Sequence, residues 1–279
     1  MMANEIVNKD DQIPDYLRDY TKKERIGNLD ESDRIVPRLQ LLQAISPEVT
    51  EYDNAKAGCF WHNLAAQNLG DRVKAIPIIV RKSVILWAPR GDDRGILARS
   101  MDCVNWDNPN MEFQVKLKGV AKPVTWATRE SVKESGLLEF GSSVPGDSNS
   151  NPAASLTYNT MWYLVEFPEF SPVVVINTRS SLKPTQQLYN RIEMRPVSHY
   201  AQLWELGVTQ EKGAEGPYFN YTYRAAGYPE QPAMEAAHRL YDRFKQVEWM
   251  ANDETDKESA PPSRGNGDKP VNEKMAEKF

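Results

Sequence analysis

Basic side chains and a tryptophan crowd into residues 72–99 of this chain. The segment holds seven Arg or Lys and two Asp, whereas the whole chain carries a net charge of −5. Arg and Lys bind phosphates, and an exposed ring such as that of Trp87 can stack on an unpaired base, which contributes roughly 1–3 kcal/mol per base. The segment therefore predicts binding of a single-stranded nucleic acid. The alternative is an edge strand that its cationic side chains keep soluble, with Trp87 in the core.

A second cationic stretch lies between Phe113 and Arg129, a range that contains no acidic residue. The candidate phosphate contacts in the two stretches are Arg81, Lys82, Arg90, Arg94, Arg99, Lys116 and Lys118. The candidate stacking residues are Trp87, Trp126, Tyr218 and Tyr221. Binding through many phosphates makes the affinity depend strongly on salt and little on base sequence.

Residues 218–224 alternate so that their side chains point to two faces of a strand. The faces carry Phe219, Tyr221 and Tyr223 on one side and Tyr218, Asn220, Thr222 and Arg224 on the other. The three rings of the first face either form a stacking platform or fill the core. The second face is expected to be exposed, which adds Arg224 to the candidate nucleic-acid contacts.

Metal binding and catalysis find little support in the sequence. Cys59 and His62 have the spacing of two zinc ligands and Cys103 follows later, but a structural site needs four ligands and the chain has only three histidines. Buried thiols, a packed histidine and no cofactor are expected. Because no nucleotide-binding, zinc-protease or hydrolase motif is present, the protein is not expected to be an enzyme. The alternative is a magnesium-dependent nuclease whose carboxylates would be Asp92, Asp93, Asp102 and Asp107.

The order of the predicted elements indicates the fold class. The expected elements are strands at 58–64, 76–87 and 111–118, a hairpin at 160–177, a helix at 180–195, a hairpin at 200–224 and a helix at 231–250. The first two strands are expected to pair as a hairpin. This order predicts an α+β fold, mainly β, built on an OB-like barrel of about five to seven strands, with one helix before the last hairpin and one at the C-terminal end.

The two ends of the chain differ in composition from its body. Residues 1–36 carry nine acidic and six basic residues, residues 251–279 carry seven and five, and 23 of each remain between them. We expect a partly disordered N-terminal arm at 1–36, a nucleic-acid-binding body at 37–250 with a loop at 141–155, and a disordered acidic tail at 251–279. Acidic ends suit a nucleic-acid binder with competing tails, and equally a protein whose tails keep it soluble.

Several features favour a soluble protein of a reducing compartment. No apolar run approaches the length of about 20 residues that a membrane helix needs. The start of the chain is polar and acidic, unlike a signal peptide. Two cysteines are too few for a disulfide framework. We therefore expect a cytoplasmic protein without membrane contacts.

A basic, aromatic body followed by an acidic tail that ends in an aromatic residue resembles the layout of bacteriophage single-stranded DNA-binding proteins. The tail residues that carry this resemblance are Asp253, Glu254, Asp256, Glu258 and Phe279. The resemblance implies that the barrel holds single-stranded DNA, while the tail binds replication proteins and competes with DNA for the groove. This tail departs from the pattern because Lys269, Lys274 and Lys278 dilute its acidity. Residues 200–228 also resemble uncharacterised phage proteins.

The leading hypothesis is a sequence-nonspecific single-stranded DNA-binding protein that supports phage DNA replication or recombination. Its partners are then single-stranded DNA, replication proteins at the tail and, where copies associate, the protein itself. A phage structural or assembly protein that does not bind nucleic acid is the first alternative, and the nuclease is the second.

Overall fold

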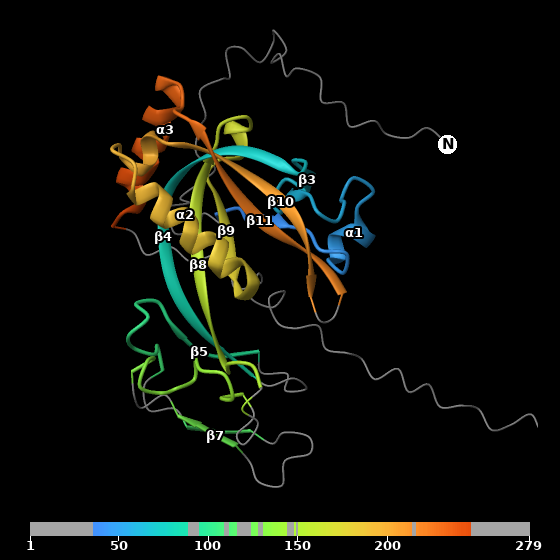
Figure 1. The fold of residues 1–279 in the computed structure, drawn as a ribbon, viewed down its shortest axis with the longest axis vertical. Coiled ribbons are helices and arrows are strands. Elements are labelled where there is room, and N and C mark those ends of the chain that lie inside the picture. The colour runs from blue at the N-terminus through green and yellow to red at the C-terminus, as the bar shows by residue number, and fades with distance from the viewer. Residues whose placement is uncertain are drawn as a thin grey trace, which may run out of the picture. The chain divides into compact units, whose positions relative to one another are not determined.

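The computed structural model describes residues 36–88, 95–108, 112–115, 124–127, 131–143, 148, 150–213 and 216–246, with backbone alone at 112–115 and 124–127 (Figure 1). All of these residues belong to one unit of the chain, Val36–Phe279. The expected arm, apart from Val36, and the expected tail at 251–279 lie outside the described residues.

Six antiparallel strands form the main sheet, because long runs of aliphatic and β-branched residues favour extended backbone. The strands are β4 (Arg72–Trp87), β5 (Ile96–Ser100), β8 (Ala154–Leu164), β9 (Val173–Thr178), β10 (Leu203–Gly213) and β11 (Gly216–Gly227). Their order is β11-β10-β4-β8-β9, and β5 pairs with β4. Figure 1 shows β4 as one long curved strand, which pairs with β10 near its start and with β5 near its end. The predicted strand at 76–87 and both predicted hairpins, β8–β9 and β10–β11, are confirmed.

Two smaller sheets accompany the main one. The first contains β1 (Leu39–Leu41), β2 (Phe60–His62) and β3 (Gln67–Asn68), and the second contains β6 (Glu112–Val115) and β7 (Val124–Ala127). The expected hairpin between 58–64 and the long strand is wrong, since β2 pairs with β1 and β3. The physical reason is that β10 pairs with β4 at Arg72–Ala75, the start of the strand, where a hairpin with residues 58–64 would have to form.

The helices are few and short. They are α1 (Pro47–Glu51), α2 (Leu182–Glu193) and α3 (Gln231–Phe244), with 3-10 turns η2 (Pro168–Phe170), η3 (Arg179–Ser181) and η4 (His199–Ala201). The two longer helices were predicted, although α3 ends six residues earlier than the sequence pattern suggests. None of the helices in the described part of the chain is long and apolar enough to cross a bilayer.

Helices α2 and α3 cover opposite faces of the main sheet. Leu188 of α2 packs in the same cluster as Trp162, whereas Ala237 of α3 packs in the same cluster as Met161. Met161 and Trp162 are neighbours on β8, and successive side chains of a strand point to opposite faces. The sheet is therefore buried on both sides at this level.

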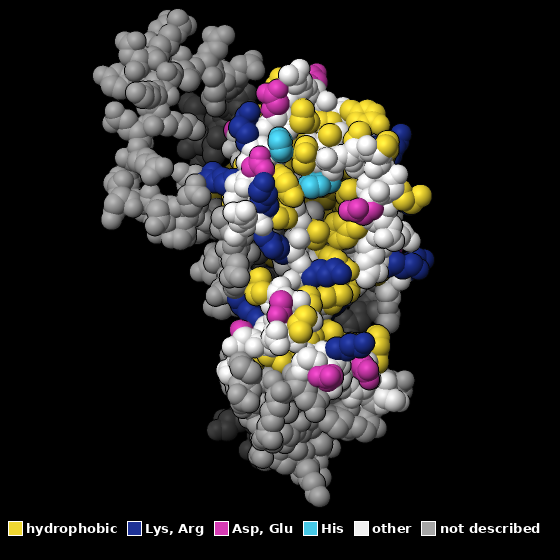
Figure 2. All heavy atoms as spheres, turned by 90° about the vertical axis from the view of Figure 1, so that its left-hand side faces the viewer, with side chains coloured by type: hydrophobic (Ala, Val, Ile, Leu, Met, Phe, Trp, Pro, Cys, Tyr) yellow, Lys and Arg dark blue, Asp and Glu magenta, His cyan; other side chains and the backbone are white. Residues whose placement is uncertain are grey.

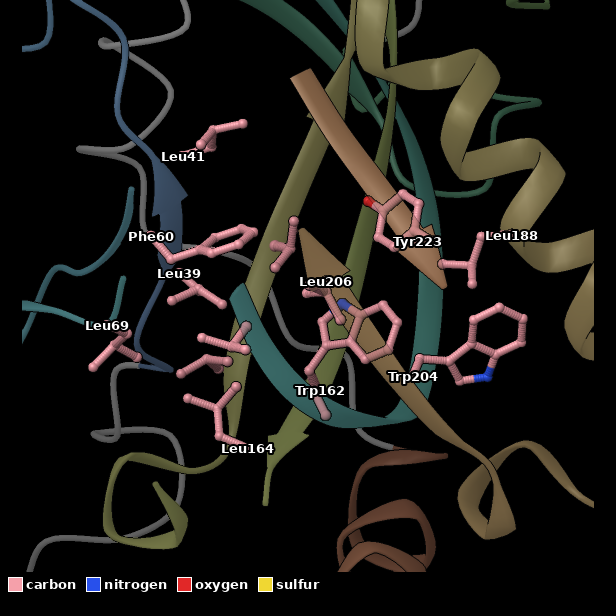
Figure 3. Packing of buried hydrophobic residues seen from close by; sticks show 14 of the residues in the cluster. Leu39, Leu41, Phe60, Leu69, Trp162, Leu164, Leu188, Trp204, Leu206 and Tyr223 are labelled. Atoms are coloured by element: carbon pink, nitrogen blue, oxygen red, sulfur yellow. The ribbon is translucent and has the colours of Figure 1, made fainter. Parts of the chain in front are cut away.

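The largest apolar cluster lies on the α2 side of the sheet (Figure 3). Trp162, Leu206 and Tyr223 meet there from three strands, and the Trp162 and Tyr223 rings stack with centroids 6.3 Å apart. Asn177 Nδ2 donates to the Tyr223 hydroxyl at 3.1 Å, so β9 and β11 touch through side chains and not through a backbone ladder. The predicted α+β class, mainly β, is confirmed, and the described sheets are open and do not close into a barrel.

Side chains occupy the outer edge of β11. The Gln43 side chain accepts from Phe219 N at 2.8 Å and donates to Phe219 O at 2.9 Å. Asn220 Oδ1 accepts from Tyr221 N, and Arg191 and Arg195 donate to Tyr223 O and Gly227 O, respectively. Each of these carbonyl or amide groups would otherwise need a neighbouring strand or water.

Candidate nucleic-acid interface

One face of β4, β8 and β9 divides into two halves. In the first half, which we call the apolar half, Ile76, Ile78, Met161 and Val174 pack against α3. Helix α3 ends at Phe244, and just beyond it Lys245 O accepts a hydrogen bond from Arg81 Nη2 at 3.0 Å. Arg81 therefore marks the boundary at which the cover of α3 stops.

The second half of the same face carries polar and cationic side chains, and we call it the polar half. Its members are Arg81, Ser83, Ile85 and Trp87 of β4, Arg99 of β5, Ser155, Thr157 and Asn159 of β8, and Thr178 of β9. Strand registers place them together: Ile85 pairs with both Arg99 and Ser155, and Thr157 pairs with both Ser83 and Thr178. No Asp or Glu occurs among the described residues of these four strands within the polar half.

Three of the sequence-predicted contacts thus share one surface. Arg81 and Trp87 are six positions apart on β4 and point to the same face, and Arg99 joins them from β5. All three side chains are half-buried. Figure 2 shows the side on which α3 and β4 lie in Figure 1, and there Lys and Arg are interspersed with Asp and Glu. The cations therefore do not form one uninterrupted basic stripe over that view.

Lys82 lies on the opposite face from Arg81. Its Nζ sits 5.4 Å from the centre of the buried Tyr158 ring, on the α2 side of the sheet. Consecutive residues of a strand diverge, so Arg81 and Lys82 do not line one groove.

The aromatic candidates of β11 lie away from the polar half. The Tyr221 ring packs between Phe60 and Tyr223, with centroids 6.1 and 6.2 Å away, and so is partly buried against the core cluster. The Tyr218 hydroxyl donates to Glu211, which raises the pKa of Tyr218. Arg224 is exposed, but its strand joins the sheet through β10, which pairs with β4 only at residues 72–75.

Asn220 differs from its predicted exposure. It is 3% exposed, and its Nδ2 donates to Ser180 O and to Glu211 Oε1. The turn before α2 therefore covers this position of β11, which a strand pattern alone does not reveal.

Several candidate residues cannot be placed. Arg90, Arg94, Lys116, Lys118, Trp126, Asp92, Asp93 and the tail residues Asp253, Glu254, Asp256, Glu258 and Phe279 lie outside the residues whose side chains the structure describes.

Four polar residues that line a pocket on this surface escaped the sequence analysis, as did Ser83 and Asn159 beside it. Ser155, Thr157 and Thr178 border a shallow pocket with Trp87, and Arg179 stands at its rim. Ser155 and Thr157 were missed because the sequence analysis predicted a loop at 141–155 and a strand only from residue 160, whereas β8 begins at Ala154. The alternation of Ser155 and Thr157 with Leu156 and Tyr158 is nevertheless typical of a strand. Arg179 has a positive φ of 50°, an uncommon conformation for which its sequence context gives no signal.

The candidate metal ligands serve structural roles. Ala65 N donates to His62 Nδ1 at 3.0 Å, so the His62 hydrogen lies on Nε2 and points to Phe170 O at 3.3 Å. Burial lowers the pKa of His62, which keeps the ring neutral. Cys59 and Cys103 are free, half-buried thiols. Among the described residues no group of three or more His, Cys, Asp or Glu could hold a metal ion.

The described carboxylates proposed for a nuclease hold a loop together. Asp102 accepts hydrogen bonds from Val104 N, Asn105 N and the Ser100 hydroxyl, and these donors hold the pKa of Asp102 well below its usual range. Asp107 accepts from Arg99 N at 2.8 Å and fixes the edge of β5.

The fold and this surface define an α+β protein with a cationic, hydroxyl-rich half-face on an open sheet. Residues 7–250 match the model of the family described as Pam3 phage gp34-like protein, and the chain belongs to that family. This match supports the resemblance to phage proteins but does not bear on binding of single-stranded DNA. Searches of curated proteins and of solved structures find no match.

Proposed function

We propose that this protein binds single-stranded DNA without sequence preference and supports phage DNA replication or recombination. The observation that carries the proposal is the polar half, where Arg81, Arg99 and Trp87 share one sheet face and the described residues of its four strands include no Asp or Glu. Guanidinium groups bind phosphates, and an indole at their side offers a surface for an unpaired base. In this proposal the curved sheet acts as an open counterpart of the OB barrel, which holds single strands across its strands.

The acidic tail is part of the same proposal. Lys245 O contacts Arg81, so the chain leaves α3 at the boundary of the polar half. Asp253 follows eight residues later, within about 29 Å of fully extended chain. We infer that the tail competes with DNA for the polar half, because both are anionic, and that replication proteins bind the tail.

A salt-dependent titration tests DNA binding. Labelled oligo-dT is titrated with the full-length protein at several salt concentrations, and the slope of log K against log salt is expected to be about −0.7 for each phosphate neutralised. Tryptophan fluorescence is expected to fall with the same midpoint, because a base stacks on Trp87. A flat salt dependence, or no binding at micromolar protein, rejects the proposal.

A phage structural or assembly protein is the second candidate. Two large apolar side chains favour it: Met194 at the end of α2 is 84% exposed and Tyr228 at the end of β11 is 65% exposed. The two residues lie near each other, because Arg195, which follows Met194, donates to the carbonyl oxygen of Gly227, which precedes Tyr228, at 3.4 Å. Sedimentation separates the two candidates: large assemblies that form without nucleic acid favour the structural role, whereas monomers or dimers that bind oligo-dT favour the first.

A further inference from the structure

The pocket in the polar half spans three adjacent strands. Its walls are Ile85 and Trp87 of β4, Ser155 and Thr157 of β8, and Ile176, Thr178 and Arg179 at the end of β9. These seven residues include three hydroxyl groups and one guanidinium, and none of them is acidic. Hydroxyl groups and a guanidinium are donors that commonly contact phosphate oxygens in protein–DNA complexes.

Thr157 supplies the observation that points to a ligand. The residue is only 2% exposed, and its Oγ1 has no hydrogen-bond partner among the residues that the structure describes. Ser83, its neighbour on β4, already accepts a hydrogen bond from Asn159 Nδ2 at 3.1 Å. A buried hydroxyl normally has a partner, so an unsatisfied one that lines a pocket indicates an atom that binds there.

The backbone beside the pocket holds Arg179 in a fixed place. Thr178 O accepts from the Ser181 hydroxyl at 2.7 Å, which closes the turn between β9 and α2. Arg179 adopts its positive φ within this turn, and its side chain is exposed at the pocket rim. Uncommon backbone conformations of this kind cluster at binding sites, because surrounding contacts must maintain them.

From these contacts we infer that the pocket binds a phosphate group, and, resting on the proposed function, that this group is a backbone phosphate of the single strand. One phosphate oxygen accepts from Thr157 Oγ1 and another from Thr178, while the Arg179 guanidinium neutralises the charge at the rim. The adjacent Trp87 then meets the base of the same or the next nucleotide. The pocket has room for about one water-sized group, so the base itself stays outside.

Two substitutions and two matched controls test this inference. Arg179→Gln is expected to weaken oligo-dT binding several-fold and to reduce the salt slope by about 0.7, since one phosphate contact is lost. Thr157→Val is expected to weaken binding about three- to tenfold with an unchanged slope, because it removes a neutral donor. Lys212→Gln on the exposed tip of β10 and Thr222→Val on exposed β11 serve as controls and are expected to leave affinity nearly unchanged.

A second measurement separates this inference from the proposed function. Inorganic phosphate is titrated into the protein, and backbone amide NMR signals of Thr157, Thr178 and Arg179 are followed, with expected shifts that Arg179→Gln abolishes. If the native protein binds oligo-dT while both pocket variants keep its affinity and slope, the inference is overturned and the proposed function stands. If oligo-dT does not bind but phosphate shifts these signals, the pocket is supported and the proposed function fails. If neither binds, both are overturned.

Discussion

The apolar and polar halves lie on the same face of the same three strands. Ile76, Met161 and Val174 are fully buried beneath α3, whereas Ser83, Thr157 and Thr178 occupy the equivalent face further along β4, β8 and β9. The change in residue type coincides with the end of α3, where Arg81 contacts Lys245 O. Burial alone does not separate the two halves, because Ser83 and Thr157 are only 3% and 2% exposed although they lie beyond the end of α3. The apolar half contributes to stability, and the proposed function places binding at the polar half.

The largest expected effect is on stability and falls on the apolar half. Met161→Ala is expected to lower the free energy of unfolding by about 2–5 kcal/mol, because it leaves a cavity between β8 and α3. Urea denaturation measures the change. Thr157→Val, on the same strand and face, is the control and is expected to leave stability equal or higher, since it removes an unsatisfied hydroxyl. An equal loss of unfolding free energy in the two variants would show that the two halves contribute equally to stability.

The next effect is on binding and falls on the polar half. Trp87→Ala is expected to weaken oligo-dT binding by about 1–3 kcal/mol, because a stacking surface is lost. Fluorescence anisotropy measures the affinity, and Trp87→Phe, which retains a ring, is expected to recover part of it. An unchanged affinity in Trp87→Ala assigns the indole to packing alone.

A smaller effect is expected from the tail. Deleting residues 251–279 removes a net charge of −2 and is expected to tighten oligo-dT binding several-fold at low salt. The gain is expected to shrink as salt screens the competition. Thermal unfolding is expected to stay unchanged. Identical affinity with and without the tail reduces its role to keeping the protein soluble.

The smallest effect concerns pH and sharpens the description of the apolar half. His199 Nε2 lies 2.7 Å from Ile78 O, and burial lowers the pKa of His199 as it does that of His62. The unfolded state therefore binds more protons, so their contribution to stability is complete above about pH 6.5 and is lost as the pH falls toward the lowered values. The melting temperature is expected to drop between pH 7.5 and 5.5, and less so in His199→Gln. The same drop in His199→Gln rules out His199 as a source of the effect.

Local patterns predicted much of the fold and part of the interface. Runs of Val and Ile mark β4 and β9, and helical spacing marks α2. The period of two on β4 also implies that Arg81 and Trp87 share a face. The same period places Lys82 on the other face, a consequence that is lost when a cationic segment is treated as one unit.

The features that sequence patterns missed depend on contacts between distant segments. Tyr221 enters the core because Phe60, from a separate sheet, packs against it. Asn220 is covered by the turn at Ser180. The pocket needs Thr157, Thr178 and Trp87 from three strands whose register the sequence does not state. Such positions can be assigned only once the strand order is known.

The side chains along β11 limit how copies of this protein can meet. Several outward carbonyl and amide groups of β11 are already bonded to side chains, among them those of Gln43, Arg191 and Arg195, and a strand of this kind is a poorer template on which a second copy could extend the sheet. If the protein binds DNA as proposed, neighbouring copies on one strand would meet at this border through side chains. Such copies could separate again without breaking backbone hydrogen bonds between their sheets.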